Sequence, residues 1–159
     1  GIEWIPTESP VFSVSVSSRA EGLHAAYLAP QFFQRAVAPG YAYWPAIDVV
    51  NDGSSAWSIV SPIHCSYHLY TGNGQLVVWD GARAKIGLPS GTRDSRIYGP
   101  NLPVQTGQTA SCGFFDFVAP WEPGTYIVEW DMVYEGSFWF SERGVTPRRD
   151  TFTVLPPAS

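Results

Sequence analysis

The sequence has few charged residues and almost no lysine. Charged residues make up 14% of the 159 residues, and Lys85 is the only lysine. Proteins that neutralise a phosphate backbone carry clustered basic residues. Disordered chains combine high charge with few apolar residues, whereas 45% of this chain is apolar. We therefore expect a folded protein that does not bind nucleic acid.

Long hydrophobic runs are also missing, and cysteine is scarce. No apolar run approaches the roughly 20 residues that cross a bilayer, so we expect no membrane insertion. Residues 1–4 lack the basic and apolar regions of a signal peptide, which fits a mature product or an excised domain. Cys65 and Cys112 are the only cysteines. In an extracellular or cell-envelope protein such a pair predicts a disulfide, and two free buried thiols are the alternative.

Proline and glycine are abundant and divide the chain into short segments. Fourteen prolines and fifteen glycines leave no long amphipathic stretch for a helix. Residues 11–18, 63–70 and 125–135 alternate apolar and polar side chains, as strands with one buried face do. We predict an all-β, immunoglobulin-like antiparallel β-sandwich of about seven to nine strands over residues 21–159. Residues 1–20 are expected to be an extension with one strand, either a linker or a strand that pairs with a partner.

Turn residues locate the connections between these strands. Residues 72–74 read Gly-Asn-Gly and predict a tight hairpin between 63–70 and 75–79. Residues 21–35 are interpreted as a lead-in strand or a short turn. Residues 81–107 predict a long connection with at most a short edge strand, and long loops on rigid sandwiches often carry binding residues.

Three stretches carry a resemblance to a known family. Residues 49–57 read V-V-N-D-G-S-S-A-W, residues 119–126 read A-P-W-E-P-G-T-Y, and residues 130–144 read W-D-M-V-Y-E-G-S-F-W-F-S-E-R-G. Together they resemble tryptophan-marked immunoglobulin-like domains of bacteria, of the kind attached to surface-polysaccharide and glycan-handling proteins. The resemblance covers about residues 25–155 and implies a sandwich fold. Its usual D-G-x-R-x-x-L-P stretch is present only as Asp80-Gly81-Ala82-Arg83 with Leu88-Pro89, and an insertion follows through Leu102-Pro103.

Aromatic residues supply the candidate ligand contacts. Aromatics make up 15% of the chain, with seven Trp and eight Tyr, more than a core of this size needs. Successive side chains of a strand point to opposite faces, so one ring of residues 138–140 should approach solvent, and we expect Trp139. The alternative makes Trp139 a core residue beside an ion pair of Glu135 with Arg143. The expected ligand-binding residues are Trp139, Glu135, Arg143, Trp79 and Tyr98, with Glu142 as a further polar contact.

No catalytic grouping is visible. His64 and His68 lie four apart on a predicted strand, about 13 Å along it, too far to share a metal ion. Asp131 and Glu135 have the same spacing, beyond the roughly 5–9.5 Å that glycoside hydrolysis uses. We therefore expect no enzyme, no catalytic residue and no cofactor. The metal alternative is a calcium ion on Asp131 or Glu135.

These observations favour recognition over chemistry. The leading hypothesis is a carbohydrate-binding module in an exported or cell-envelope protein, with a glycan or polysaccharide as partner. A second hypothesis is a structural subunit of an extracellular fibre or surface layer, in which residues 11–18 add a strand to another copy of the chain. A glycoside hydrolase is the third.

Overall fold

The computed structural model describes residues 22–57, 63–84, 86–89, 103–113 and 115–158. Within these ranges the chain forms strands and one short 3₁₀-helix, η3 (Phe140–Arg143), which confirms the all-β prediction. No helix in the described part of the chain is long and apolar enough to cross a membrane. The expected strand at 11–18 and the candidate ligand residue Tyr98 lie outside the described residues.

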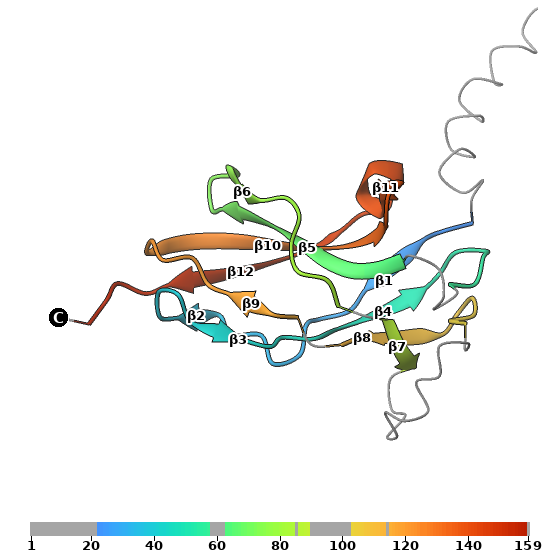
Figure 1. Ribbon diagram of the computed structural model, residues 1–159, viewed down its shortest axis with the longest axis horizontal. Helices are drawn as coiled ribbons and strands as arrows, with labels where there is room; N and C mark the ends of the chain where they lie inside the picture. Colours follow the sequence, from blue (N-terminus) through green and yellow to red (C-terminus); the bar gives the residue numbers. More distant parts are fainter. Residues whose placement is uncertain (1–21, 58–62, 85, 90–102, 114, 159) are drawn as a thin grey trace, which may run out of the picture.

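The strands pack in two layers (Figure 1). One sheet has the order β1 (Ala25–Tyr27), β4 (Ile47–Asn51), β8 (Thr109–Cys112) and β7 (Ile86–Pro89). The other has the order β2 (Ala36–Val37), β12 (Arg148–Val154), β10 (Gly124–Tyr134), β5 (Ile63–Thr71) and β6 (Leu76–Val78), with β11 (Phe138–Trp139) paired to β10. A two-stranded ribbon joins β3 (Ala42–Tyr43) to β9 (Phe117–Val118). The β2–β12 pair is parallel and the other pairs are antiparallel.

The connectivity is that of a sandwich whose two sheets exchange strands. Immunoglobulin constant-type sandwiches place their first, second, fifth and fourth strands in one sheet and the others in the facing sheet. With the two-residue strands set aside, β1, β4, β8 and β7 are the first, second, sixth and fifth strands, so the order differs from that pattern by one strand, β6, which extends the facing sheet beside β5. The described part contains more strands than the seven to nine expected. The excess consists of the two-residue strands β2, β3, β9 and β11, which are too short to show alternation in the sequence.

Aromatic rings and one disulfide fill the space between the layers. Trp130 lies at the centre and contacts Tyr67 and Phe115, with ring centroids 6.2 and 5.4 Å away. A disulfide joins Cys65 of β5 to Cys112 of β8, with 6.0 Å between the Cα atoms. It therefore links the two sheets, which confirms the predicted disulfide and excludes two free thiols.

Two of the quoted sequence stretches form corners that hold the ends of the sandwich. The buried Asn51 side chain donates hydrogen bonds to the carbonyls of Ser55 and Val104, both at 2.9 Å, and accepts one from the Gly53 N–H. The Tyr126 hydroxyl donates to the Glu122 carbonyl at 2.8 Å, the contact that defines a tyrosine corner. Both stretches thus have structural roles.

The predicted hairpin connects β5 to β6. The Gly74 N–H donates to the Thr71 carbonyl at 2.9 Å, and the Thr71 N–H donates to the Gln75 carbonyl at 2.8 Å. Gly74 has a φ of 92°, a conformation that glycine adopts without a steric penalty. The prediction for residues 63–79 is therefore confirmed.

Candidate functional site

The candidate site lies on the outer face of the six-stranded sheet. Side chains alternate along β10, so Trp130 and Met132 face the core between the sheets while Asp131 and Val133 face outward. Beside these outward residues is a cavity of about 400 Å³, which we call the outer hollow. Its lining comes from the segment after β6, the end of β10, β11 and η3: Trp79, Asp80, Arg83, Val133, Tyr134, Glu135, Gly136, Ser137, Phe138, Trp139 and Glu142.

A tight turn folds β11 back onto β10 and places Trp139. Gly136, with a φ of 73°, forms the turn, and β11 pairs in the register Val133 with Trp139. The Glu142 carboxylate accepts a hydrogen bond from the Trp139 N–H at 2.8 Å. Trp139 is only 8% exposed, so the expectation that its ring reaches solvent is wrong. The ring is covered because it packs against the outer face of the sheet, a contact with residues distant in the sequence.

Trp79 and Trp139 line the outer hollow, and the buried His68 ring packs against both of them. The Trp79 indole stacks on the His68 imidazole, with centroids 3.8 Å apart and planes 17° apart. Trp139 meets both rings, at 4.4 Å from His68 and 5.7 Å from Trp79. Trp79 remains 40% exposed. Because His68 covers one face of the indole and Trp139 packs against the ring at 64°, the exposed part lies on the side away from these two rings.

Arg83 supplies a fixed positive charge beside these rings. Its guanidinium pairs with Asp80 at 2.6 Å and with Glu135 at 2.8 Å, and it lies 5.0 Å from the centroid of the Trp139 ring. Partial burial alone lowers the pKa of Arg83, but the hydrogen bonds to Glu135 and Asp80 outweigh it and raise that pKa. The guanidinium therefore stays charged, and its planar donors are held in one orientation.

A buried polar network forms the floor beneath the rings. The two Asp131 oxygens accept hydrogen bonds from His68 Nε2 at 2.9 Å and from the Ser141 hydroxyl and the Met132 N–H at 2.5 and 2.9 Å. His68 Nδ1 contacts the Trp79 carbonyl. Both imidazole nitrogens thus lie against oxygen atoms, which hold the ring in one orientation. The network fixes the ring on which Trp79 stacks.

Tyr27 of β1 closes this network from the other sheet. Its hydroxyl accepts a hydrogen bond from the Met132 N–H at 2.9 Å and donates to Asp131 at 3.4 Å. The Met132 N–H needs such a partner because the pairing of β12 with β10 ends at Trp130. Burial raises the pKa of Tyr27 well above its usual value of 10.0, and the charge of Asp131 raises it further.

Sequence reasoning found part of this site. The structure brings together three of the five predicted ligand residues, Trp79, Glu135 and Trp139. Arg143 does not line the hollow, and its guanidinium lies 4.1 Å from the centroid of the Phe138 ring.

The alternative ion pair of Glu135 with Arg143 is not the pairing observed, since Glu135 binds Arg83. Arg83 was not predicted from the sequence as a site residue. It lies three residues after Asp80, and the opposite charges of these two residues could have indicated the ion pair.

The acidic side chains at the outer hollow are already engaged in hydrogen bonds and ion pairs. Among the described residues, no three His, Cys, Asp or Glu side chains lie together as metal ligands. Asp131 is buried, with donors on both oxygens, and Glu135 is paired with Arg83. A calcium ion needs six to eight oxygen ligands. The arrangement of fixed rings and paired charges therefore suits the non-covalent binding of a polar ligand with an apolar face.

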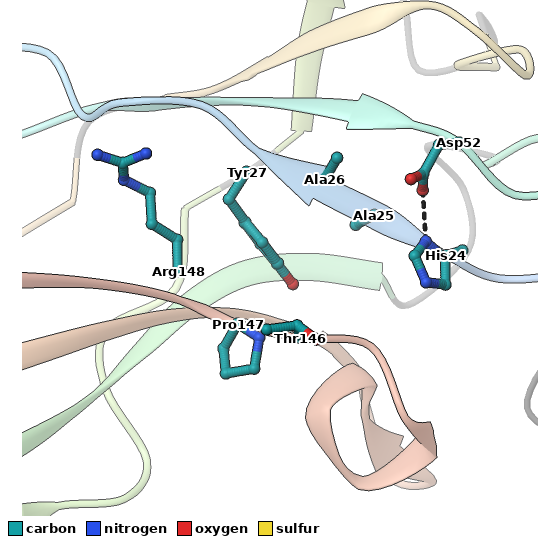
Figure 2. A pocket seen from close by; sticks show the side chains of 8 residues that line it. All are labelled: His24, Ala25, Ala26, Tyr27, Asp52, Thr146, Pro147 and Arg148. Carbon is teal, nitrogen blue, oxygen red and sulfur yellow. Dashed lines mark hydrogen bonds and ion pairs between the residues drawn. The ribbon is translucent and has the colours of Figure 1, made fainter.

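A second cavity of about 310 Å³ lies at the edge of the sandwich, between β1 and residues 146–148 (Figure 2). His24 Nδ1 contacts an Asp52 oxygen at 2.5 Å, and Arg148 pairs with Asp150 at 3.0 Å. Figure 2 shows the Tyr27 side chain crossing this cavity with its hydroxyl directed toward the segment that carries Thr146 and Pro147. With both acidic–basic pairs already formed, this cavity offers fewer ligand contacts than the outer hollow.

Comparisons with known proteins assign no family. No family model and no curated protein matches the chain. Among solved structures, the chain is similar to a family 123 glycoside hydrolase from Clostridium perfringens, with 16% identity, a TM-score of 0.41 and coverage of 77% of this chain but only 22% of that one. It thus spans about a fifth of that hydrolase.

Two further structures have a similar or lower score. AvmM, which catalyses macrocyclization in alchivemycin A biosynthesis, has 10% identity and a TM-score of 0.43 over 87% of this chain and 92% of that one. A conjugative transposon lipoprotein from Bacteroides eggerthii has 10% identity and a TM-score of 0.29 over 82% and 96%. These likenesses place the chain in no family, and its function has to be argued from the site.

Proposed function

We propose that this protein is a non-catalytic carbohydrate-binding module of an exported or cell-envelope protein and that the outer hollow is its binding site. The observation that carries the proposal is Trp79, a partly exposed indole held flat on His68 at the wall of a cavity lined by fixed charges.

The chemistry of a sugar ring matches this wall. A pyranose has an apolar face of C–H groups and an edge of hydroxyls, so it packs on an indole while polar side chains bind its hydroxyls. Four of the five Arg83 N–H groups already have acceptors in Glu135, Asp80, Ser66 and Gly81, which leaves one for a ligand, while the carboxylates of Glu135 and Asp80 provide acceptors. The Arg83 ion pairs hold these groups in place before binding, which lowers the entropy cost of association.

The outer hollow carries more negative than positive charge, which disfavours anionic ligands. Three carboxylates, those of Asp80, Glu135 and Glu142, line it against the single guanidinium of Arg83. The excess negative charge repels carboxylate and sulfate groups. We therefore expect neutral sugars or amino sugars to bind in preference to uronic acids.

The arrangement of the carboxylates supports a non-catalytic role. Glycoside hydrolysis needs one carboxyl that donates a proton and a second that acts as base or nucleophile. Glu135 is engaged by a guanidinium and Asp131 lies beneath the rings, within a closed hydrogen-bond network. The disulfide supports the assignment to an oxidising compartment such as the cell exterior or envelope.

Isothermal titration tests the proposal. The wild-type protein and Trp79→Ala are titrated with neutral, amino-sugar and uronic-acid oligosaccharides. We expect binding of a neutral or amino-sugar ligand and a loss of about tenfold or more in affinity in Trp79→Ala, the effect of removing one aromatic contact.

The matched control is Leu76→Ala, which removes an exposed apolar side chain from the same hairpin outside the hollow. It should bind as the wild type does. Trp139 is unsuitable as a first probe because its buried ring also stabilises the fold. Heat signals absent for every oligosaccharide, or equal affinities for wild type and Trp79→Ala, would contradict the proposal.

One observation favours a second candidate function, assembly by strand addition. β6 is the outermost strand of its sheet and carries Leu76 and Val77, both exposed. An open edge with apolar side chains is a template for an added strand, and the alternating residues 11–18 of another copy are a candidate. Light scattering over a concentration series tests this function, since a strictly monomeric protein contradicts it.

A further inference from the structure

The β3–β9 ribbon has an outward face that the proposed hollow does not use. Tyr43 and Phe117 are opposite each other in the ribbon, and both are buried. Because strand side chains alternate, the neighbouring pair Ala42 and Val118 points to the other side, and both are exposed. The ribbon therefore covers the core with one face and presents the other to solvent.

Trp44 extends this outward face at one end. It is 60% exposed, yet its indole N–H donates a hydrogen bond to the Asp116 carboxylate at 2.9 Å. Asp116 lies two residues before Val118 and therefore on the same face of the ribbon. The hydrogen bond fixes the orientation of a ring that packing alone would leave free.

Trp121 lies at the other end of the ribbon. It is 77% exposed, the highest exposure among the large apolar side chains of the described residues. Its ring lies against Gly40, where an added Cβ would come within 2.5 Å of it. The ribbon continues to this point, because the Gly40 N–H donates to the Pro120 carbonyl at 3.2 Å. A second exposed indole is thus seated on the backbone.

The two rings are separated by small side chains. Gly40 and Trp44 are four residues apart, which is no more than about 13 Å along an extended strand. Ala42 and Val118 pair with each other at the register position between Gly40 and Trp44. We propose that the outward face of the β3–β9 ribbon binds an extended polysaccharide chain, with Trp44 and Trp121 packing on the faces of two sugars along it.

The size and charge of this face favour a glycan over other occupants. One aromatic side chain buries about 150–250 Å², so even two largely exposed rings fall short of the roughly 800 Å² per partner that a stable protein interface buries. Asp116 places a carboxylate on this face, and the chain carries a net charge of −5. That charge opposes binding to an anionic lipid surface.

This inference rests on the proposed function for the class of ligand but not for the site. The ribbon belongs to strands other than those that line the outer hollow, and Figure 1 shows it in the opposite layer from β11. An open ribbon suits a long or insoluble chain, whereas the hollow suits a short segment or a chain end.

Co-sedimentation with washed insoluble cellulose, chitin and peptidoglycan tests the proposal. The proteins compared are wild type, Trp44→Ala, Trp121→Ala and Trp44→Phe, with Leu76→Ala as an exposed apolar control on the other sheet. We expect each alanine variant to lose about tenfold in apparent affinity. Trp44→Phe keeps a ring but loses the bond to Asp116, so an intermediate loss is expected. Thermal midpoints within error of the wild type would show that the variants are folded.

Three outcomes overturn the proposal. If both alanine variants sediment as the wild type does while Trp79→Ala loses soluble oligosaccharides, the ribbon is not a binding face and the proposed function stands. If the wild type binds no soluble or insoluble glycan, both fail. If Trp121→Ala instead abolishes self-association in light scattering and leaves sedimentation unchanged, the ribbon is an interface between copies.

Discussion

Tyr27 is a single side chain that couples the stability of the fold to pH. Its folded-state pKa is raised by burial first and by the charge of Asp131 second. Its stabilising contribution is therefore fully present below the unfolded value of about 10 and is lost as pH rises toward the folded value. We expect the free energy of unfolding in urea to be level below pH about 10 and to fall above it, and Tyr27→Phe to reduce that fall.

Part of the alkaline fall will persist in this variant, because burial also raises the pKa values of Tyr43 and Tyr67. Tyr41→Phe, which removes an exposed phenol, serves as the control. If the free energy of unfolding falls above pH about 10 as steeply in Tyr27→Phe as in the wild type, the raised pKa of Tyr27 does not contribute to the loss of stability.

At the same scale, the sequence predicted which residue types meet at the site but not their partners. Trp79, Glu135 and Trp139 do line one cavity. The burial of Trp139 depends on His68 and the pairing of Glu135 depends on Arg83. These partners are about 50 to 70 residues away in the chain, and alternation within one strand carries no information about them.

The β10–β11 hairpin depends on the backbone conformation of Gly136. Its φ of 73° is strained for other residues, and a Cβ there meets nothing within 4 Å, so substitution acts through the backbone alone. We expect Gly136→Ala to destabilise the fold by about 1 kcal/mol. Gly136→Asn should cost less, because Asn tolerates this region better. Urea unfolding of the three proteins measures the order, and equal stabilities would contradict it.

Long strands and short strands differ in how far they could be predicted. β5 and β10 contain enough alternating residues for periodicity to identify them, and the Gly-Asn-Gly turn located the hairpin that follows β5. β2, β3, β9 and β11 have two residues each. Such pairings arise when the folded chain brings distant segments side by side, so no local pattern reveals them.

The whole molecule is joined across its layers by the Cys65–Cys112 disulfide. It closes a loop over a sequence separation of 47 residues, for which loss of chain entropy in the unfolded state corresponds to about 4 kcal/mol. We expect reduction, or the double variant Cys65→Ala with Cys112→Ala, to lower the free energy of unfolding by an amount of this order. Urea titrations with and without reductant measure it, and identical midpoints would contradict the expectation.

The sequence predicted an all-β sandwich, but it did not predict the order of the strands within each sheet. Turn spacing and alternation establish short antiparallel strands. They do not show that β5 and β8 face each other across the core, which is what allows their cysteines to bond. That information lies in the packing of distant segments.

The outer hollow is built on the side of its sheet that faces away from the disulfide-linked interior. Its rim residues Asp80, Glu135 and Ser137 can consequently be exchanged without opening a void among the central rings. The molecule is thus suited to engineering by library diversification of this rim, with new ligand selectivity sought independently of thermal robustness.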